Sequence, residues 1–165
     1  MIISKYALPT AFAMAWFCFL GSTRSEEEVQ DRYIVVLFSS KDFRKVEKEA
    51  HRLAKSSGTP FATNGHIYDS KKGLVLPEDS EDEMYRGQYL ARRFHSDSVT
   101  EKGDERGYLS IEKSEAYKGL RPDEYVVVAG IRENKSLAQK DLDFYRTWAP
   151  GAFYVKCPLY LGCIH

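Results

Sequence analysis

Aromatic, arginine and glutamine side chains gather in one short stretch near the middle of the chain. Residues 85–95 read YRGQYLARRFH, and the members with binding chemistry are Tyr85, Arg86, Gln88, Tyr89, Arg92 and Arg93. Aromatic faces stack on sugar rings, while arginine and glutamine donate hydrogen bonds to hydroxyl, acetamido and carboxylate oxygens. The stretch therefore predicts a groove for a saccharide or an anionic ligand. The structural alternative is that the rings anchor an insertion while the arginines stay solvated.

A second polar and aromatic group, Tyr108, Glu112 and Tyr117, follows further along the chain. The Glu112 carboxylate is able to accept hydrogen bonds from a sugar or to pair with an arginine of the first stretch. We therefore add Tyr108 and Glu112 to the candidate ligand-binding residues, and the structural ion pair stays the alternative for Glu112.

Catalytic and metal-binding patterns are missing from the sequence. The four histidines show no H-x-x-x-H or H-E-x-x-H spacing, and neither a G-x-S-x-G elbow nor a phosphate loop occurs. The carboxylates of 78–83 lack the alternating ligands of an EF-hand loop and are expected to form a solvated loop. We predict a non-enzymatic protein with no cofactor and no metal. A secreted enzyme using Glu112 or the histidines is the alternative.

The first residues have the pattern of a secretory signal peptide. Lys5 precedes an apolar run from Tyr6 to Leu20, and the small residues Gly21-Ser22-Thr23 follow. The run is shorter than the roughly 20 residues that a membrane-spanning helix needs, so an uncleaved anchor is the lesser alternative. We expect a signal peptide over 1–25 and a polar leader over 26–31. The mature protein would then be periplasmic or extracellular, with no membrane span.

Charge and cysteine content restrict the partners and the chemistry further. The 24 basic and 24 acidic residues balance, which gives no reason to expect a nucleic-acid partner. After export, Cys157 and Cys163 would be the two remaining cysteines, in an oxidising compartment. Their C-x5-C spacing predicts a local disulfide. The alternatives are a metal site with His165 and a free thiol.

Two similar units of strand and helix position these residues. The first has an expected strand, Tyr33–Phe38, and a helix over Phe43–Ala54 that Ser39-Ser40 caps and Gly58 ends. The second has a strand, Tyr125–Ile131, and a helix over Leu137–Trp148 that begins with a Ser136/Gln139 capping box. One further strand is expected within Phe61–Leu76, a strand or helix start at Tyr108–Glu112, and a last strand at Ala152–Val155.

This order predicts an α+β fold in which two β-α-β units form one split, ferredoxin-like arrangement. The sheet would be antiparallel with both helices on one face. A single domain would cover 32–165, with a long insertion at about 61–121. Successive residues of a strand point to opposite faces of the sheet, and both predicted central strands are apolar on both faces. Both faces of the sheet should therefore be covered.

The two units together resemble the sporulation-related repeat (SPOR) domain. The resemblance covers Arg32–Ser57 and Glu124–Lys156, and it departs from the family in the length of the middle connection. It implies an exported bacterial envelope protein that binds peptidoglycan, with a preference for glycan strands stripped of their peptides. The long connection is positioned to cover the sheet face on which the family binds glycan. The expected partner is therefore a peptidoglycan glycan or, as the alternative, an envelope protein bound by an interaction module without saccharide affinity.

Overall fold

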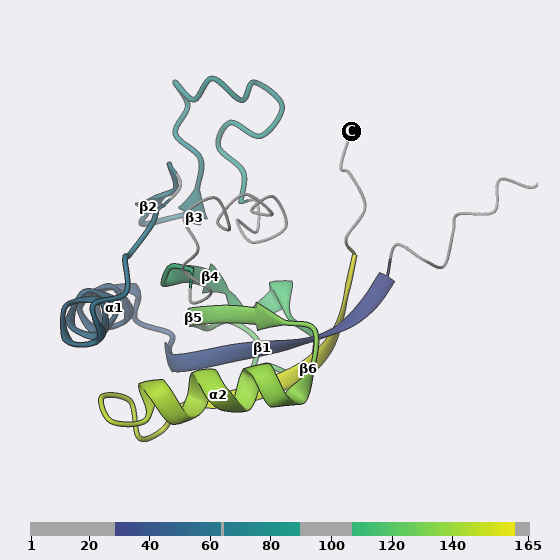
Figure 1. Ribbon diagram of the computed structural model, residues 1–165. Coiled ribbons are helices and arrows are strands. Elements are labelled where there is room, and N and C mark those ends of the chain that lie inside the picture. The colour runs from purple at the N-terminus through teal and green to yellow at the C-terminus, as the bar shows by residue number, and fades with distance from the viewer. Residues whose placement is uncertain (1–28, 64, 90–106, 161–165) are drawn as a thin grey trace, which may run out of the picture.

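The computed structural model describes residues 29–63, 65–89 and 107–160. A sheet of four strands forms its centre, in the order β4 (Ser110–Lys113), β5 (Tyr125–Arg132), β1 (Val29–Ser40), β6 (Phe153–Tyr160). Every pair of neighbours in it is antiparallel. With the helices α1 (Phe43–Ser57) and α2 (Lys135–Tyr145), this confirms an α+β protein (Figure 1). Val35 and Val127 lie in the shared ladder of β1 and β5.

Strand β1 is longer than the sequence predicts. It begins at Val29, so residues 29–31 of the expected polar leader pair with Tyr160–Pro158 of β6. Asp31 also forms an ion pair of 2.6 Å with Lys156 on β6. This end of the strand is solvent-exposed, which explains why no apolar alternation marked it.

Both helices begin at caps other than the expected ones. The Asp42 carboxylate accepts hydrogen bonds from the backbone of Arg44 and Lys45, while Ser40 accepts from Asp42 N. At α2 the cap is Asn134, whose side chain accepts from Leu137 N at 3.0 Å. The predicted Ser39-Ser40 cap and Ser136/Gln139 capping box are therefore wrong, because neighbouring Asp and Asn residues take that role. Gly58 ends α1 as predicted, in a left-handed conformation.

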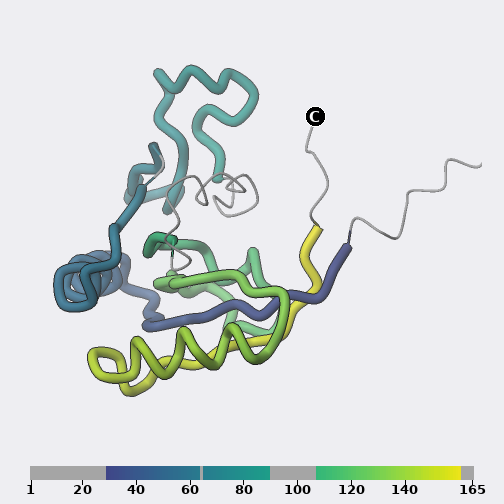
Figure 2. Tube along the Cα trace, viewed as in Figure 1, coloured from purple at the N-terminus to yellow at the C-terminus, as the bar shows by residue number. Residues whose placement is uncertain are grey.

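The middle connection contributes two separate pieces. Its first part forms a hairpin of β2 (Ile67–Asp69) and β3 (Gly73–Val75), which is a sheet of its own and lies above α1 in the traces (Figures 1 and 2). Its later part supplies β4, the edge strand of the main sheet, and then the short 3-10 helix η4 (Ser114–Ala116). Tyr108–Glu112 thus leads into a strand rather than a helix.

Both faces of the main sheet are buried, as the double-sided apolar pattern predicts. One face packs against the two helices through a cluster that includes Val35, Val127, Leu53 and Leu142. The opposite face buries Ile34, Val36, Val126, Val128, Cys157 and Leu159 beneath Tyr117, with Ala116 and Leu120 beside them. The later part of the middle connection therefore covers the sheet face that carries no helix. No helix among the described residues is long and apolar enough to cross a membrane.

Candidate functional site

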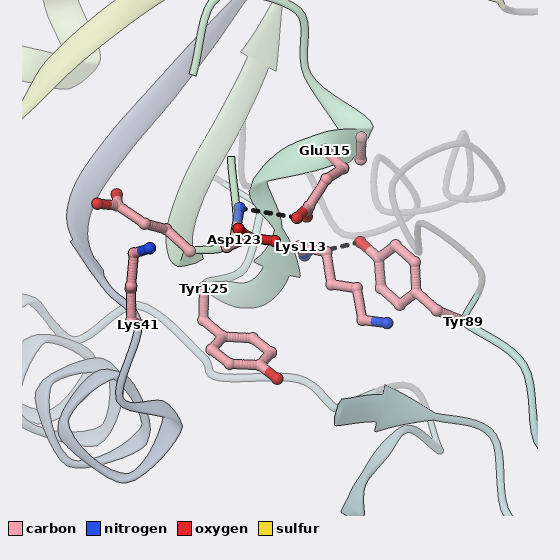
Figure 3. A pocket seen from close by; sticks show the side chains of 8 residues that line it. Lys41, Tyr89, Lys113, Glu115, Asp123 and Tyr125 are labelled. Atoms are coloured by element: carbon pink, nitrogen blue, oxygen red, sulfur yellow. Dashed lines mark hydrogen bonds between the residues drawn. The ribbon is translucent and has the colours of Figure 1, made fainter. Parts of the chain in front are cut away.

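A pocket of about 750 Å³ opens beside the end of β4 and the start of β5. The short link between β1 and α1 and the end of the middle connection also line it. We call it the edge pocket. It is lined by Lys41, Tyr89, Lys113, Glu115, Ala116, Asp123, Glu124 and Tyr125 (Figure 3). Its volume falls in the range of small-molecule sites, about 300–1,000 Å³. Its walls combine two tyrosines with side chains of both charges.

Tyr89 is held in the pocket wall by two hydrogen bonds. Its hydroxyl donates to Glu112 Oε2 at 3.0 Å and accepts from the backbone N–H of Lys113 at 3.0 Å. Burial, and then the nearby Glu112 carboxylate, raise the pKa of Tyr89 far above its ordinary value. Glu112 itself is fully buried on β4. Glu112 therefore orients Tyr89 from the protein interior, and it does not line the pocket.

Two lysines bring positive charge to the edge pocket. Lys113 Nζ lies 5.0 Å from the centre of the Tyr89 ring, within cation–π range, and donates to the Lys72 carbonyl at 3.4 Å. Lys41 is exposed on the other side, directly before α1. Among the described residues, neither lysine forms an ion pair with a carboxylate. Both ammonium groups are therefore available to an anionic ligand.

The acidic side of the pocket is built on a tight turn. Glu115 Oε1 accepts from Asp123 N at 2.8 Å, and the backbone N–H of Glu124 donates to Ser114 Oγ at 3.1 Å. Asp123 has φ 57°, the one positive φ of a non-glycine residue in the described part of the chain. Asp tolerates this left-handed conformation better than most residues. The turn thus brings carboxylates, which accept hydrogen bonds from hydroxyls, to the wall of the pocket.

Tyr125 forms the wall between the pocket and the β2–β3 hairpin. Its ring meets Phe43 edge-on at 5.3 Å and Tyr68 edge-on at 6.0 Å between ring centres. Burial foremost, and then Tyr68 and Glu115, raise the pKa of its hydroxyl. The hairpin approaches closely at Gly73, where a Cβ atom would lie 2.7 Å from Tyr125 Oη. The absence of a side chain at Gly73 thus lets the hairpin pack against Tyr125.

The side chains that line the edge pocket can bind a polar ligand through hydrogen bonds and ring contacts. No group of three or more His, Cys, Asp or Glu residues that could hold a metal ion occurs among the described residues. The edge pocket offers tyrosine rings for a sugar face, carboxylates for hydroxyls and two lysines for an anionic substituent. Such a set fits a saccharide that carries a carboxylate.

The predicted binding residues are only partly brought together. Tyr89 lines the edge pocket and contacts Glu112, whereas Tyr108 is buried just before β4. Arg92 and Arg93 lie outside the described residues. The other predicted members, Tyr85, Arg86 and Gln88, make local contacts in the connection that precedes Tyr89.

Most of those local contacts are with backbone carbonyl groups. Arg86 Nε donates to the Ser80 carbonyl at 2.6 Å, and Arg86 pairs with Glu83 at 3.6 Å. The backbone of Gln88 donates to the Tyr85 carbonyl at 3.0 Å. None of the three lines the edge pocket. Their contacts stabilise the segment that leads to Tyr89.

Sequence reasoning missed most of the pocket wall. In the sequence, Lys41 follows the first predicted strand, Asp123 precedes the predicted strand Tyr125–Ile131, and Tyr125 begins that strand. A single charged residue before an element carries no binding signal of its own. The tertiary fold alone brings these residues together with Tyr89.

The predicted disulfide is not found in the described part of the chain. Cys157 has a free, buried thiol whose Sγ lies 3.6 Å from the Pro158 carbonyl oxygen. Burial raises its pKa. Cys163, its expected partner, and the expected signal peptide both lie outside the described residues.

Comparison of the chain with protein-family models, with curated proteins and with solved structures gave no match. The fold and the edge pocket define an α+β domain with an antiparallel sheet and an open, mixed-charge pocket at the edge of that sheet.

Proposed function

We propose that the protein is a non-enzymatic binding module of the bacterial cell envelope that takes glycan strands of peptidoglycan after removal of their peptides. The observation that carries the proposal is the edge pocket, which is lined by two tyrosines and by two lysines without carboxylate partners in the described part of the chain, and in which Lys113 lies over the Tyr89 ring. Hydrolysis of the amide that joins a peptide to the glycan leaves a free carboxylate on the sugar. A carboxylate of this kind suits Lys41 or Lys113, and the sugar face suits the tyrosines.

The strand order supports a fold relationship to the sporulation-related repeat. Strands β1 and β4 both run antiparallel to β5 between them, and β5 and β6 both run antiparallel to β1 between them. One unit consists of β1, α1 and β4, and the other of β5, α2 and β6. The two strands of each unit thus lie on either side of one strand of the other unit. We interpret this as the split, ferredoxin-like arrangement of two β-α-β units.

The binding surface proposed here differs from that of the family. Tyr117, with 1% of its surface exposed, covers the sheet face that carries no helix, together with Leu120. A glycan would have to displace this cover to reach the strands. The edge pocket is open without such a rearrangement, so we place the ligand there.

Co-sedimentation with purified peptidoglycan, with and without amidase treatment, tests the proposal. We expect more protein to be retained on the treated material. Replacing both lysines (Lys41→Gln with Lys113→Gln) should weaken retention by about tenfold or more, since each lost charged hydrogen bond is worth on the order of 1.5 kcal/mol. The matched control is Lys48→Gln with Lys55→Gln, which removes the same charge from exposed positions of α1. Retention on neither material would refute the glycan ligand.

A protein-interaction module is the second candidate. Ile67 and Tyr68 expose 49% and 42% of their surface on the β2–β3 hairpin, and exposed apolar side chains of this size are common at protein interfaces. Crosslinking in the envelope that captures one discrete protein, with no retention on either peptidoglycan preparation, would favour this candidate.

A further inference from the structure

A second hollow lies on the other side of the aromatic residues that wall the edge pocket. It has a volume of about 550 Å³ and runs between α1 and the β2–β3 hairpin, and we call it the helix groove. Its floor includes the buried residues Leu74 and Ile111. Its other lining residues are Phe43, Arg44, Glu47, His51, Phe61, Thr63, His66, Ile67 and Tyr68.

One rim of the helix groove is polar and solvent-exposed. Arg44, Glu47 and His51 are spaced along α1 so that they lie on one side of the helix. Within the described residues, no ion pair or side-chain hydrogen bond engages Arg44 or Glu47. The His51 ring packs edge-on against Phe61 at 4.7 Å. The rim thus offers donors and acceptors above an apolar floor.

The helix groove and the edge pocket share an aromatic wall. Phe43 and Tyr68 stack face to face, with ring centres 4.2 Å apart and an interplanar angle of 3°. Both rings meet Tyr125 edge-on, and Tyr125 lines the edge pocket. Tyr68 is still 42% exposed although its ring stacks on Phe43. An exposed ring of the helix groove thus lies directly beside Tyr125 of the edge pocket.

We propose that the helix groove is a second binding subsite that continues the edge pocket, so that the protein holds a linear chain of sugars across Tyr125 and Tyr68. This inference rests on the proposed function. Tyr68 supplies a ring for the apolar face of one sugar, and the apolar floor takes a small group such as an acetamido methyl. Glu47 and Arg44 bind hydroxyl and carbonyl oxygens from the rim. The ligand is a polymer rather than a single sugar unit.

The test compares two fragments of amidase-treated glycan, a disaccharide and a chain of eight sugars, by calorimetric titration of the full protein. Two linked contacts should make the longer fragment bind at least about tenfold more tightly. Tyr68→Ala should bring the ratio of the two affinities close to one. Tyr68→Phe keeps the ring and should keep the ratio. Tyr160→Ala removes an exposed tyrosine of β6 and is the matched control.

The outcomes separate this inference from the proposed function. Equal affinity of the wild-type protein for both fragments overturns the second subsite and leaves the edge pocket as the glycan site. A Tyr68→Ala variant that keeps the full ratio also overturns the second subsite. Binding of neither fragment overturns both proposals. Should Tyr68→Ala fail to fold, Glu47→Gln at the exposed rim replaces it, with a reduced ratio expected and an unchanged ratio counting against the subsite.

Discussion

The Tyr89 hydroxyl connects the buried interior to the surface of the edge pocket. It donates to the fully buried Glu112 carboxylate and accepts from the Lys113 backbone, so one atom fixes the ring on which Lys113 Nζ rests. A buried carboxylate needs hydrogen-bond donors to remain tolerable in a protein interior. The same contact therefore serves the stability of β4 and the shape of the pocket.

Removal of that hydroxyl should cost stability. We expect Tyr89→Phe to lower the free energy of unfolding by about 1–3 kcal/mol, because it takes away one donor to a buried carboxylate. Urea denaturation followed by circular dichroism measures the change. Tyr68→Phe, at an exposed position on β2, should change the free energy much less. Equal stability of Tyr89→Phe and the wild type would show that Glu112 does not depend on this bond.

The same tyrosine predicts a loss of stability at alkaline pH. In the unfolded chain Tyr89 loses its proton near its ordinary pKa, about 10. In the folded protein burial raises its pKa, so the folded state keeps the proton. Above about pH 10 the unfolded state therefore binds fewer protons, and the free energy of unfolding falls as pH rises.

Tyr89→Phe isolates this contribution from the other tyrosines. We expect its stability to fall less steeply than that of the wild type between pH 10 and 11, by up to about 1.4 kcal/mol per pH unit. Urea denaturation at a series of pH values measures both slopes. Parallel slopes for the two proteins would contradict the placement of Tyr89 in a buried environment.

At the scale of elements, the β2–β3 hairpin owes its position to Gly73. This residue has φ 79°, and its missing side chain leaves room for Tyr125 Oη and for Lys113 Cε. The hairpin in turn carries Tyr68, which lines the helix groove and meets Tyr125 of the edge pocket edge-on. A short sheet of two strands is marginally stable alone, so its packing against Tyr125 decides where it lies.

Gly73→Ala should displace the hairpin as well as strain its turn. The left-handed conformation alone is expected to cost about 1–2 kcal/mol. The contact with Tyr125 adds to that cost and should weaken glycan binding. Gly58→Ala is the matched control, because Gly58 has φ 71° but nothing within 4 Å of a Cβ atom. Thermal unfolding and titration with the eight-sugar fragment check both effects. Equal losses in the two variants would contradict the close approach.

The sequence predicted the two strand-helix units but not how their strands and helices begin. Alternating and helical apolar spacing marked the cores of β1, α1, β5 and α2, because burial imposes those periods. The exposed start of β1 and the capping residues Asp42 and Asn134 carry no such period. Asp141 also departs from the apolar spacing of α2. It is a buried polar residue of that helix because its carboxylate pairs with Arg132 at 2.6 Å.

The candidate site was predictable only in part, for a related reason. Tyr89 and Glu112 were recognisable as residue types, yet their contact spans two segments that are separated by residues outside the described ranges. Lys41 and Asp123 enter the pocket because β1 and β5 are neighbours in the sheet. Sheet order, rather than local sequence, brings the two charges together.

At the scale of the whole molecule, the described residues cover both faces of the sheet, and the edge pocket opens at one of its edges. The two helices cover one face, and Tyr117 with its neighbours covers the other. The edge pocket and the helix groove lie on either side of one aromatic wall. Because the faces of the sheet are covered, we propose that the ligand binds at its edge.

The account depends most directly on recognition of a sugar carboxylate by Lys41 and Lys113. Isothermal titration should compare amidase-treated glycan that carries free carboxylates with the same glycan after its carboxylates are converted to neutral methylamides. We predict that the conversion weakens binding by about tenfold or more, and that added salt weakens only the binding of the charged form. Equal affinity for the charged and the neutral glycan would contradict the account.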